Sequence, residues 1–314
     1  MVLLLICAFE KFTNTKLRIK RLPHYNSNLF FKEAEYWKNF YAAFTDFLFT
    51  EKKCFDNYVG TVIRIIRAFF RYLSNEQQIN IGNFYERFYV LEEQIPVISL
   101  LPEQVSFLIN NKDFENSLSV SLRRTKDIFV FGCLLALRYS DLFNIKVTDI
   151  EEACGNKYLG IKTQKTGATV KLKLTGYTLL IIDKLIAKAG KRKILIPYIS
   201  KNQFNHNIKR IAEKAGWTKP MPKTRNRRGK QKMLYRPGTT QAYRFCDLLS
   251  SHCMRRTAIT MMLMFGVPEH IVRMISGHTK NSKSFYRYIS LVQSYLDTYM
   301  EKMSAKLSPA QTIL

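Results

Sequence analysis

The chain has 314 residues, with 50 lysines and arginines against 24 aspartates and glutamates, so its formal charge is +26. Its 13 glycines, 9 prolines and 46% of hydrophobic residues exclude a disordered, collagen-like or linker-like chain. Because so many like charges repel one another in a compact fold, we expect a polyanionic partner, and nucleic acid is favoured over an anionic membrane surface.

The cysteines and the apolar start indicate a soluble protein of a reducing, cytoplasmic compartment. The six cysteines are scattered, with no CxxC pair and no clustering with histidine, which argues against a zinc site and a disulfide framework. Residues 1–9 are apolar, but no basic segment precedes them, and they are too few to span a bilayer. No membrane partner is therefore expected.

The first third of the chain is predicted to hold a basic segment and a small helical domain. Residues 1–28 are basic and end in a turn-rich stretch. Residues 29–93 are predicted to be helical, because apolar residues recur three and four positions apart. Three arginines share one face of the second helix, where they could contact DNA phosphates or simply face solvent: Arg64, Arg67 and Arg71.

A proline-containing linker at 94–104 separates this domain from a larger one at 105–314. Two short alternating runs, Tyr158–Gln164 and Ala168–Leu174, predict a β-hairpin whose turn holds Lys165. Helical patterns follow at 176–189, 202–215, 253–265, 268–276 and 283–306. The predicted fold class is mostly α with a small antiparallel β-sheet, in a two-domain arrangement that would clamp DNA.

A strongly basic stretch lies within the larger domain. Residues 219–236 hold eight lysines and arginines and no acid, so they cannot form a core element and predict a loop or hairpin that becomes ordered against polyphosphate. The candidate DNA-binding residues of this stretch are Arg225, Arg227, Arg228, Lys230 and Lys232.

Common cofactor motifs are absent from the sequence. There is no GxxxxGK[ST] or GxGxxG loop for a nucleotide, and no HExxH or GxSxG motif. The sequence therefore predicts chemistry that needs neither a nucleotide cofactor nor a tightly held metal ion.

Two cationic groups could hold a phosphate. His252 and Arg255 lie three positions apart at the start of a predicted helix, whose free N–H groups attract anions, although an ordinary surface pair has the same spacing. Arg138 ends a nearly all-apolar helix, where core packing would fix it and Asp141 could orient it. A buried structural ion pair is the alternative interpretation of Arg138.

A third group combines a histidine with a tyrosine. Gly277 is typical of a helix end, so His278 is predicted to project from a corner. Tyr288 follows ten residues later, at the start of another amphipathic helix. A single tyrosine in such a helix usually belongs to the core, so this group gains meaning only together with the other two.

The order Arg, Lys, HxxR, GH, Tyr over 138–288 resembles the catalytic domain of the tyrosine recombinases, the phage integrase family. The matching segments are LRYSD (137–141), QKTG (164–167), SHCMRRT (251–257), SGH (276–278) and SFYRYI (284–289). The resemblance covers roughly 100–305 and is strongest to integrases of Bacteroidetes phages and mobile elements. Residues 29–93 are similar in size and position to the family's SAM-like core-binding domain.

The resemblance implies a role for each matched residue. Arg138 and Arg255 would hold the scissile phosphate, and Lys165 would protonate the leaving oxygen. His252 and His278 would complete the site around the nucleophile, Tyr288. Many family members have nine positions between the histidine and the tyrosine, which here falls on Arg287, so Tyr286 remains the alternative nucleophile.

The resemblance also implies a function. The chain would be a site-specific DNA recombinase, or integrase, that cleaves and rejoins double-stranded DNA through a covalent 3′-phosphotyrosine intermediate, without a cofactor. It would act in a bacterial cytoplasm as a homotetramer on paired sites, with the C-terminal helix docking on a neighbouring protomer. The alternatives are a type IB topoisomerase-like DNA-relaxing enzyme and a non-catalytic DNA-binding protein of the same fold.

Overall fold

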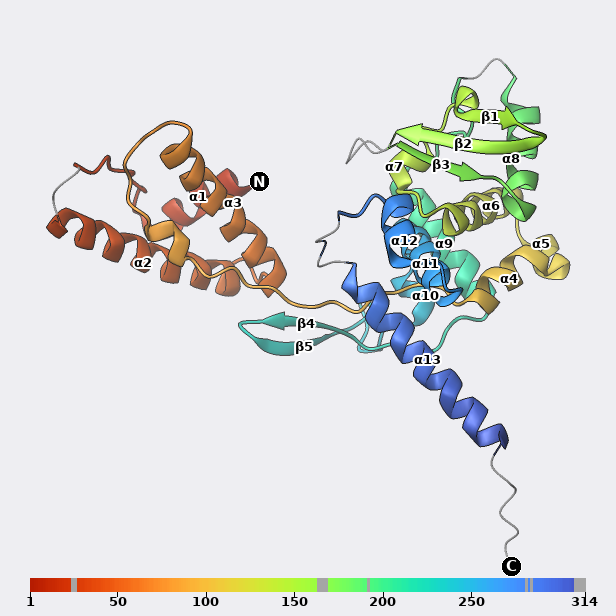
Figure 1. Ribbon diagram of the computed structural model, residues 1–314. Helices are drawn as coiled ribbons and strands as arrows, with labels where there is room; N and C mark the ends of the chain where they lie inside the picture. Colours follow the sequence, from red (N-terminus) through yellow and green to blue (C-terminus); the bar gives the residue numbers. More distant parts are fainter. Residues whose placement is uncertain (24–26, 163–168, 191–192, 280–281, 283–284, 308–314) are drawn as a thin grey trace, which may run out of the picture. The chain divides into compact units, whose positions relative to one another are not determined.

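The computed structural model describes residues 1–23, 27–162, 169–190, 193–279, 282 and 285–307 (Figure 1). Its contacts divide the chain into two compact units. Unit 1 comprises residues 1–95 and 222–242, and unit 2 comprises residues 96–221 and 243–314. The larger domain expected at 105–314 is therefore interrupted, because a segment from its middle packs with the N-terminal residues.

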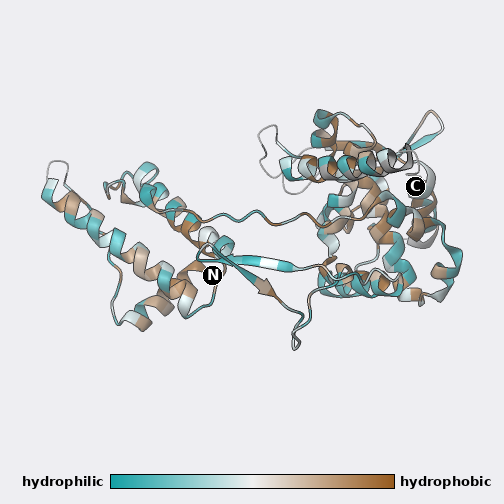
Figure 2. Ribbon diagram, turned by 90° about the horizontal axis from the view of Figure 1, so that it is seen from below, coloured by the Kyte–Doolittle hydropathy of each residue, from teal (hydrophilic) through white to brown (hydrophobic). Residues whose placement is uncertain are grey.

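Unit 1 is a small helical unit with an aromatic core. Its helices are α1 (Val2–Thr13), α2 (Ser27–Thr50), α3 (Asp56–Asn75) and the 3₁₀ helix η1 (Phe84–Arg87). The long helices alternate between polar and apolar positions, as the colours of their ribbons show in Figure 2. Trp37 of α2 stacks on Phe84 of η1 at 4.9 Å and meets Phe70 of α3 edge-on at 4.8 Å.

The basic N-terminal segment contains a helix that the charge pattern did not indicate. Phe9 of α1 is buried and contacts Phe40, Phe44 and Phe47 of α2, with ring centroids 5.2–5.7 Å apart. The apolar start of the chain is thus part of the core of unit 1.

A β-hairpin completes unit 1. Strands β4 (Lys223–Arg227) and β5 (Lys230–Leu234) pair antiparallel around Arg228 and Gly229, whose positive φ values of 54° and 71° are those of a type I′ turn. The buried carboxylate of Asp56, in the first turn of α3, accepts hydrogen bonds from both turn amides at 2.7 and 2.9 Å. The basic stretch is therefore a hairpin, held by an acid far away in the sequence.

Unit 2 is built around two helices that cross closely. Its elements are α4 (Pro102–Asn110), α5 (Lys112–Ser117), α6 (Val120–Leu135), α7 (Tyr139–Leu142), η2 (Val147–Asp149), β1 (Ile150–Ala153), β2 (Asn156–Lys162), β3 (Thr169–Lys173), α8 (Gly176–Ala189), α9 (Lys201–Lys214), α10 (Phe245–Leu248), α11 (Ser251–Met264), α12 (Glu269–Ser276) and α13 (Tyr286–Leu307). A Cβ added to Gly132 of α6 would lie 2.5 Å from Sδ of Met254 on α11, so glycine permits this approach. The crossing fixes α11 against the core.

The small sheet of unit 2 has the order β1-β2-β3 and is antiparallel throughout. The predicted hairpin corresponds to β2 and β3, and β1 is an additional strand on the free side of β2. The turn between β2 and β3, with Lys165, lies outside the described residues. Mostly α structure with small antiparallel sheets confirms the predicted fold class.

Within the described parts of the chain, no helix is both long and apolar enough to cross a membrane.

We expect Gly132→Ala to destabilise unit 2 by about 1–3 kcal/mol, because the new methyl group overpacks the α6–α11 crossing. Urea unfolding measures the change. The exposed Ser121→Ala on the same helix is the control and should stay within about 0.5 kcal/mol of wild type. A Gly132→Ala protein as stable as the control would show that the crossing is not tight.

Candidate active site

Arg255 joins three segments of unit 2. Its side chain projects from the first turns of α11, and the residue is only 3% exposed. The guanidinium donates hydrogen bonds to the carbonyl oxygen of Ala136 at 3.0 Å and to that of Ser276, and it lies 3.4 Å from Nδ1 of His278. Because these acceptors are neutral, the positive charge of Arg255 is fixed in place without being cancelled.

Arg138 lies beside Arg255 and can still donate a hydrogen bond to a ligand. It follows the left-handed residue Ala136, which ends α6, and precedes α7. Its Nη1 is 3.8 Å from Oδ2 of the buried Asp141, which is consistent with the predicted orienting role. That nitrogen is buried and, among the described residues, has no hydrogen-bond partner. The guanidinium can thus still donate to an anion.

His278 sits at the corner after α12, where backbone and side-chain contacts hold its ring. Gly277 has a φ of 58°, the left-handed conformation that ends α12, and the His278 amide donates to the carbonyl of Arg273 at 2.9 Å. Nδ1 lies 2.7 Å from Oγ of Ser276 and faces the Arg255 guanidinium. The Ser276 hydroxyl also donates to the carbonyl of Val272 at 2.6 Å, so these contacts hold the ring in place without defining which nitrogen carries its proton.

Tyr288, but not Tyr286, belongs to this cluster. The Tyr288 ring lies in the first turn of α13, 6.0 Å from the His278 ring and 5.9 Å from that of Phe285. Tyr288 is 6% exposed, whereas Tyr286 is 58% exposed. Of the two tyrosines, the structure therefore brings Tyr288 to the predicted histidine and arginines.

These side chains line one cavity of about 340 Å³. Its lining residues are Val97, Arg138, His252, Arg255, Arg256, Gly277, His278, Thr279, Ser282, Arg287 and Tyr288. Among these described lining residues, four are arginines, two are histidines and none is an acid. A cavity of this composition suits a phosphate group.

Sequence reasoning missed Arg256 and Arg287 in this cavity. Arg256 lies beside Arg255 in the matched segment SHCMRRT, and its positive charge opposes the rise in the pKa of Tyr288. The doubled arginine was the available signal. No sequence motif marked Arg287 as a cavity residue, because its position in the lining depends on the orientation of the first turn of α13.

The concentrated positive charge shifts the pKa values of the site. Desolvation, followed by the charges of nearby arginines, lowers the pKa of His252 and of His278 from 6.5 to about 4. Desolvation and the Arg138 charge lower the pKa of Arg255 to about 10, so it stays protonated at neutral pH. Burial raises the pKa of Tyr288, while Arg256, Arg255 and Arg287 oppose that rise. At neutral pH the site thus combines charged arginines with neutral histidines.

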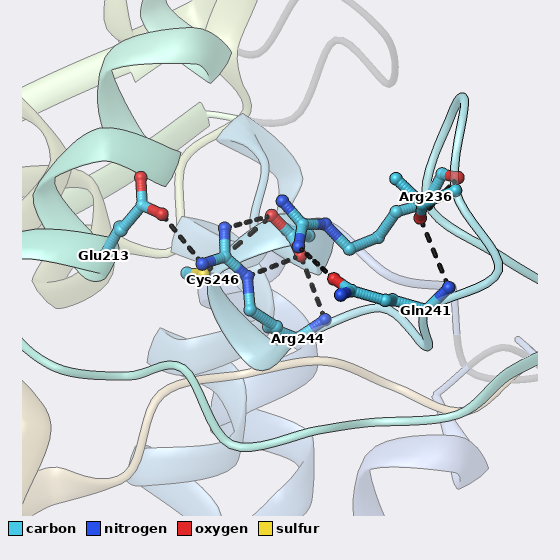
Figure 3. Close-up of polar contacts among 7 residues, drawn as sticks. Glu213, Arg236, Gln241, Arg244 and Cys246 are labelled. Carbon is cyan, nitrogen blue, oxygen red and sulfur yellow. Dashed lines mark hydrogen bonds and ion pairs between the residues drawn. The ribbon is translucent and has the colours of Figure 1, made fainter.

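A second arginine network holds the segment that leads into α11. The Arg244 guanidinium binds Asp247 of α10, with Nε 3.0 Å from Oδ2, and Glu213 of α9 at 2.8 Å (Figure 3). These carboxylates raise the pKa of Arg244. The Ser251 amide, at the start of α11, donates to Oδ1 of Asn205 at 2.7 Å. Both contacts fix the helix that carries His252 and Arg255.

The predicted DNA-binding arginines of α3 differ in their surroundings. Arg64 is exposed and pairs with Glu92 at 2.7 Å. Arg67 is half-buried and donates to the carbonyl of Phe88 at 3.4 Å. Arg71 is exposed one turn further on. The three arginines thus lie on α3 as predicted, but Arg64 and Arg67 already bind groups within unit 1.

The basic residues of the hairpin also fall into two groups. Arg227 donates to the carbonyl of Lys53 at 2.7 Å and lies 4.8 Å above the Phe55 ring. Arg228 pairs with Asp46 and lies 5.4 Å above the Phe49 ring. Arg225 is half-buried, with Nη1 2.9 Å from the carbonyl of Thr224, whereas Lys230 and Lys232 are exposed on β5.

Comparison with known proteins gives the family. Residues 99–294 match the model of the phage integrase family, which covers more than half of the chain. The chain therefore belongs to this family of tyrosine recombinases. It is a site-specific recombinase, an enzyme that breaks and rejoins DNA. No curated protein sequence matches it.

Solved structures share the fold at low identity. The integrase of transposon Tn1549, in complex with circular intermediate DNA, has 16% identity and a TM-score of 0.53 over 90% of this chain and 85% of that one. A lambda integrase tetramer bound to a Holliday junction has 12% identity and a TM-score of 0.53 over 91% and 76%. The XerH recombinase bound to its difH substrate has 14% identity and a TM-score of 0.51 over 79% and 66%, so the chain spans about two thirds of XerH.

The two histidines should respond differently to the removal of single arginines. The charge of Arg138 lowers the pKa of both His252 and His278, whereas the charge of Arg256 acts chiefly on His252. We expect Arg138→Gln to raise both pKa values from about 4, and Arg256→Gln to raise chiefly that of His252. Histidine NMR titrations measure both. Arg138→Lys keeps the charge and is the control, and two unmoved titrations in Arg138→Gln would contradict the electrostatic cause.

The same shifts affect folding stability. Since the folded-state pKa values lie below the ordinary 6.5, the unfolded chain takes up protons first as the pH falls. The histidines therefore lower stability as the pH drops from 6.5 towards 4, and Arg138→Gln should weaken this loss.

Proposed function

We propose that this recombinase cleaves DNA by attack of the Tyr288 hydroxyl on a backbone phosphate bound in the arginine-lined cavity. The attack forms a bond between the phenolic oxygen and phosphorus and expels the 5′ oxygen of the neighbouring nucleotide, which leaves a 3′-phosphotyrosine. Attack by the released 5′ hydroxyl reverses the step and rejoins a strand. The phosphoester bond is conserved throughout, so no external energy source is required.

One observation supports the proposal: a single cavity, with no acid among its described lining residues, brings together side chains from distant parts of the sequence. They are Arg138, His252, Arg255, His278 and Tyr288. A phosphodiester is anionic and repels a nucleophile, and its alkoxide leaving group is poor. Fixed guanidinium groups offset both difficulties, because they bind the non-bridging oxygens most tightly when charge builds up in the pentacoordinate transition state.

The remaining roles follow from donor and acceptor chemistry. The neutral His278 imidazole carries one N–H group and is suited to donate a hydrogen bond to a phosphate oxygen. The positive charge of Arg256 favours the Tyr288 phenolate, while neutral His252 can accept a proton. Lys165, which lies between β2 and β3 in the sequence, remains our candidate for protonating the leaving 5′ oxygen.

We expect Tyr288→Phe to abolish covalent attachment to DNA, because the attacking oxygen is removed, while DNA binding stays almost intact. The assay traps protein on a nicked suicide duplex and resolves the adduct on a denaturing gel, in magnesium and in EDTA. Tyr286→Phe is the matched control and should still trap DNA in both buffers. Trapping by Tyr288→Phe at the control level would refute the assignment, and trapping only with metal would indicate a different mechanism.

The DNA-contacting surface is proposed to include the exposed cations of α3 and β5. Lys230, Lys232 and Arg71 are exposed, whereas Arg227 and Arg228 would have to give up contacts within unit 1 to reach phosphates. We infer that the first group contacts DNA directly and that the second acts mainly by holding the hairpin.

Binding at increasing salt tests this division. Removing a side chain that neutralises one phosphate should make the log–log salt dependence of affinity less steep by about 0.9. We therefore expect Lys230→Ala and Lys232→Ala to flatten the dependence. Arg228→Ala should leave the slope closer to wild type and lower the stability of unit 1. Equal slopes for all three variants would contradict the division.

Assembly on DNA is proposed to involve α13. Its exposed Leu296 and Met300 lie one turn apart on a helix that extends beyond the rest of unit 2 (Figure 1). An apolar groove of about 500 Å³ in the same unit is lined by Trp217 and Phe245, together with Leu291 from the first half of α13. We propose that α13 of one protomer docks in this groove of the next, in a homotetramer on paired DNA sites.

The proposed setting is the cytoplasm of a bacterial host, on DNA of a phage or mobile element. All six cysteines are unpaired thiols, as expected in a reducing compartment. A DNA-relaxing enzyme of type IB would use the same nucleophile, but the match to the integrase family favours recombination.

A further inference from the structure

Arg273 is a buried cation that the proposed chemistry does not use. It lies on α12, outside the lining of the active-site cavity, and is only 7% exposed. Its Nε donates to Oε1 of Glu269 at 2.6 Å, one turn earlier on the same helix. Burying a charged group is costly unless its contacts repay the cost, so its other partners are informative.

Those partners belong to the segment between the two functional residues His278 and Tyr288. Nη1 of Arg273 donates to the carbonyl of Thr279 at 3.0 Å, directly after the histidine. The guanidinium carbon lies 4.0 Å from the centroid of the Phe285 ring and 5.4 Å from that of the Tyr286 ring. One side chain thus holds both ends of the segment 279–286.

Phe285 links Arg273 to Tyr288, the proposed nucleophile. It is fully buried, and its ring lies 5.4 Å from the His278 ring and 5.9 Å from the Tyr288 ring. The Tyr288 amide donates to the carbonyl of Phe285 at 2.9 Å, so the first turn of α13 starts from this residue. A cation on one face of the Phe285 ring fixes the direction in which that turn begins.

The start of this turn decides which tyrosine faces the cavity. Residues two apart on an α-helix point about 200° apart, so Tyr286 and Tyr288 cannot both face the same site. In the structure Tyr288 is turned inward, and the exposed Tyr286 is held on the outside beside Arg273. A rotation of the first turn would exchange them.

We propose that Arg273 is the positioning residue that selects Tyr288 over Tyr286 as the attacking tyrosine. It acts through Phe285 and the Thr279 carbonyl rather than by touching DNA. The inference rests on the proposed function, since it presupposes that the cavity binds the scissile phosphate.

The test uses full-length protein and a suicide duplex, with the site of attachment mapped by mass spectrometry of the DNA-linked peptide. We expect Arg273→Ala to form the Tyr288 adduct about 10²-fold more slowly, the size of loss typical of a misplaced reacting group, and to give part of its adduct at Tyr286. The double variant Arg273→Ala/Tyr288→Phe should form an adduct at Tyr286, whereas Tyr288→Phe alone should form none. A merely destabilising substitution would slow attachment without moving it.

Three further variants separate the explanations. Arg273→Lys keeps a cation that can reach Phe285 and should restore attachment at Tyr288. The exposed His270→Ala on the same helix is the control and should match wild type. Arg273→Met keeps the apolar stem and replaces the alanine variant if that variant does not fold. Attachment exclusively at Tyr288 in the folded alanine or methionine variant would overturn the inference, whereas absence of any wild-type adduct would overturn the proposed function instead.

Discussion

Excess positive charge in the cavity, which Asp141 beside Arg138 offsets only in part, is the constraint on which unit 2 depends. Four arginines line a space in which no described lining residue is an acid. The buried Arg255 is bound to carbonyl oxygens, which satisfy its N–H groups but leave its charge available to an anion. The mutual repulsion of these arginines lowers stability in the free protein, and an entering phosphate relieves it. The fold therefore stores binding energy by keeping acids out of the cavity.

The few acids of this basic chain are placed where they organise structure. In unit 1, Asp56 accepts both turn amides of the β4–β5 hairpin, and Glu93 accepts the amide of Asn226 at 2.9 Å. These contacts explain why a stretch without acids forms an ordered hairpin. Composition identified the stretch as basic, but its carboxylate partners lie more than 130 residues away, a separation that no local pattern reveals.

The sequence predicted most of the site because the motifs are local and their order is diagnostic. HxxR sets His252 and Arg255 on one helix, and Gly277 sets the corner for His278. The choice between Tyr286 and Tyr288 could not be made from spacing alone, because it depends on the rotation of one helical turn against Arg273 and Phe285. Helix α1 was missed because its apolar residues precede a basic run that dominated the composition.

In the proposed mechanism, the group that accepts the phenol proton must have a free acceptor atom, and several groups of the cavity have only hydrogen-bond donors. Arg138, Arg255, Arg256 and Arg287 can only donate hydrogen bonds, so none of these cavity arginines can take the phenol proton. His252 is neutral but a weak base in the free protein, with a pKa of about 4. A bound phosphate would offset the arginine charges that lower this pKa and would make His252 a stronger base. The base would then become effective only when the DNA to be cleaved is in place.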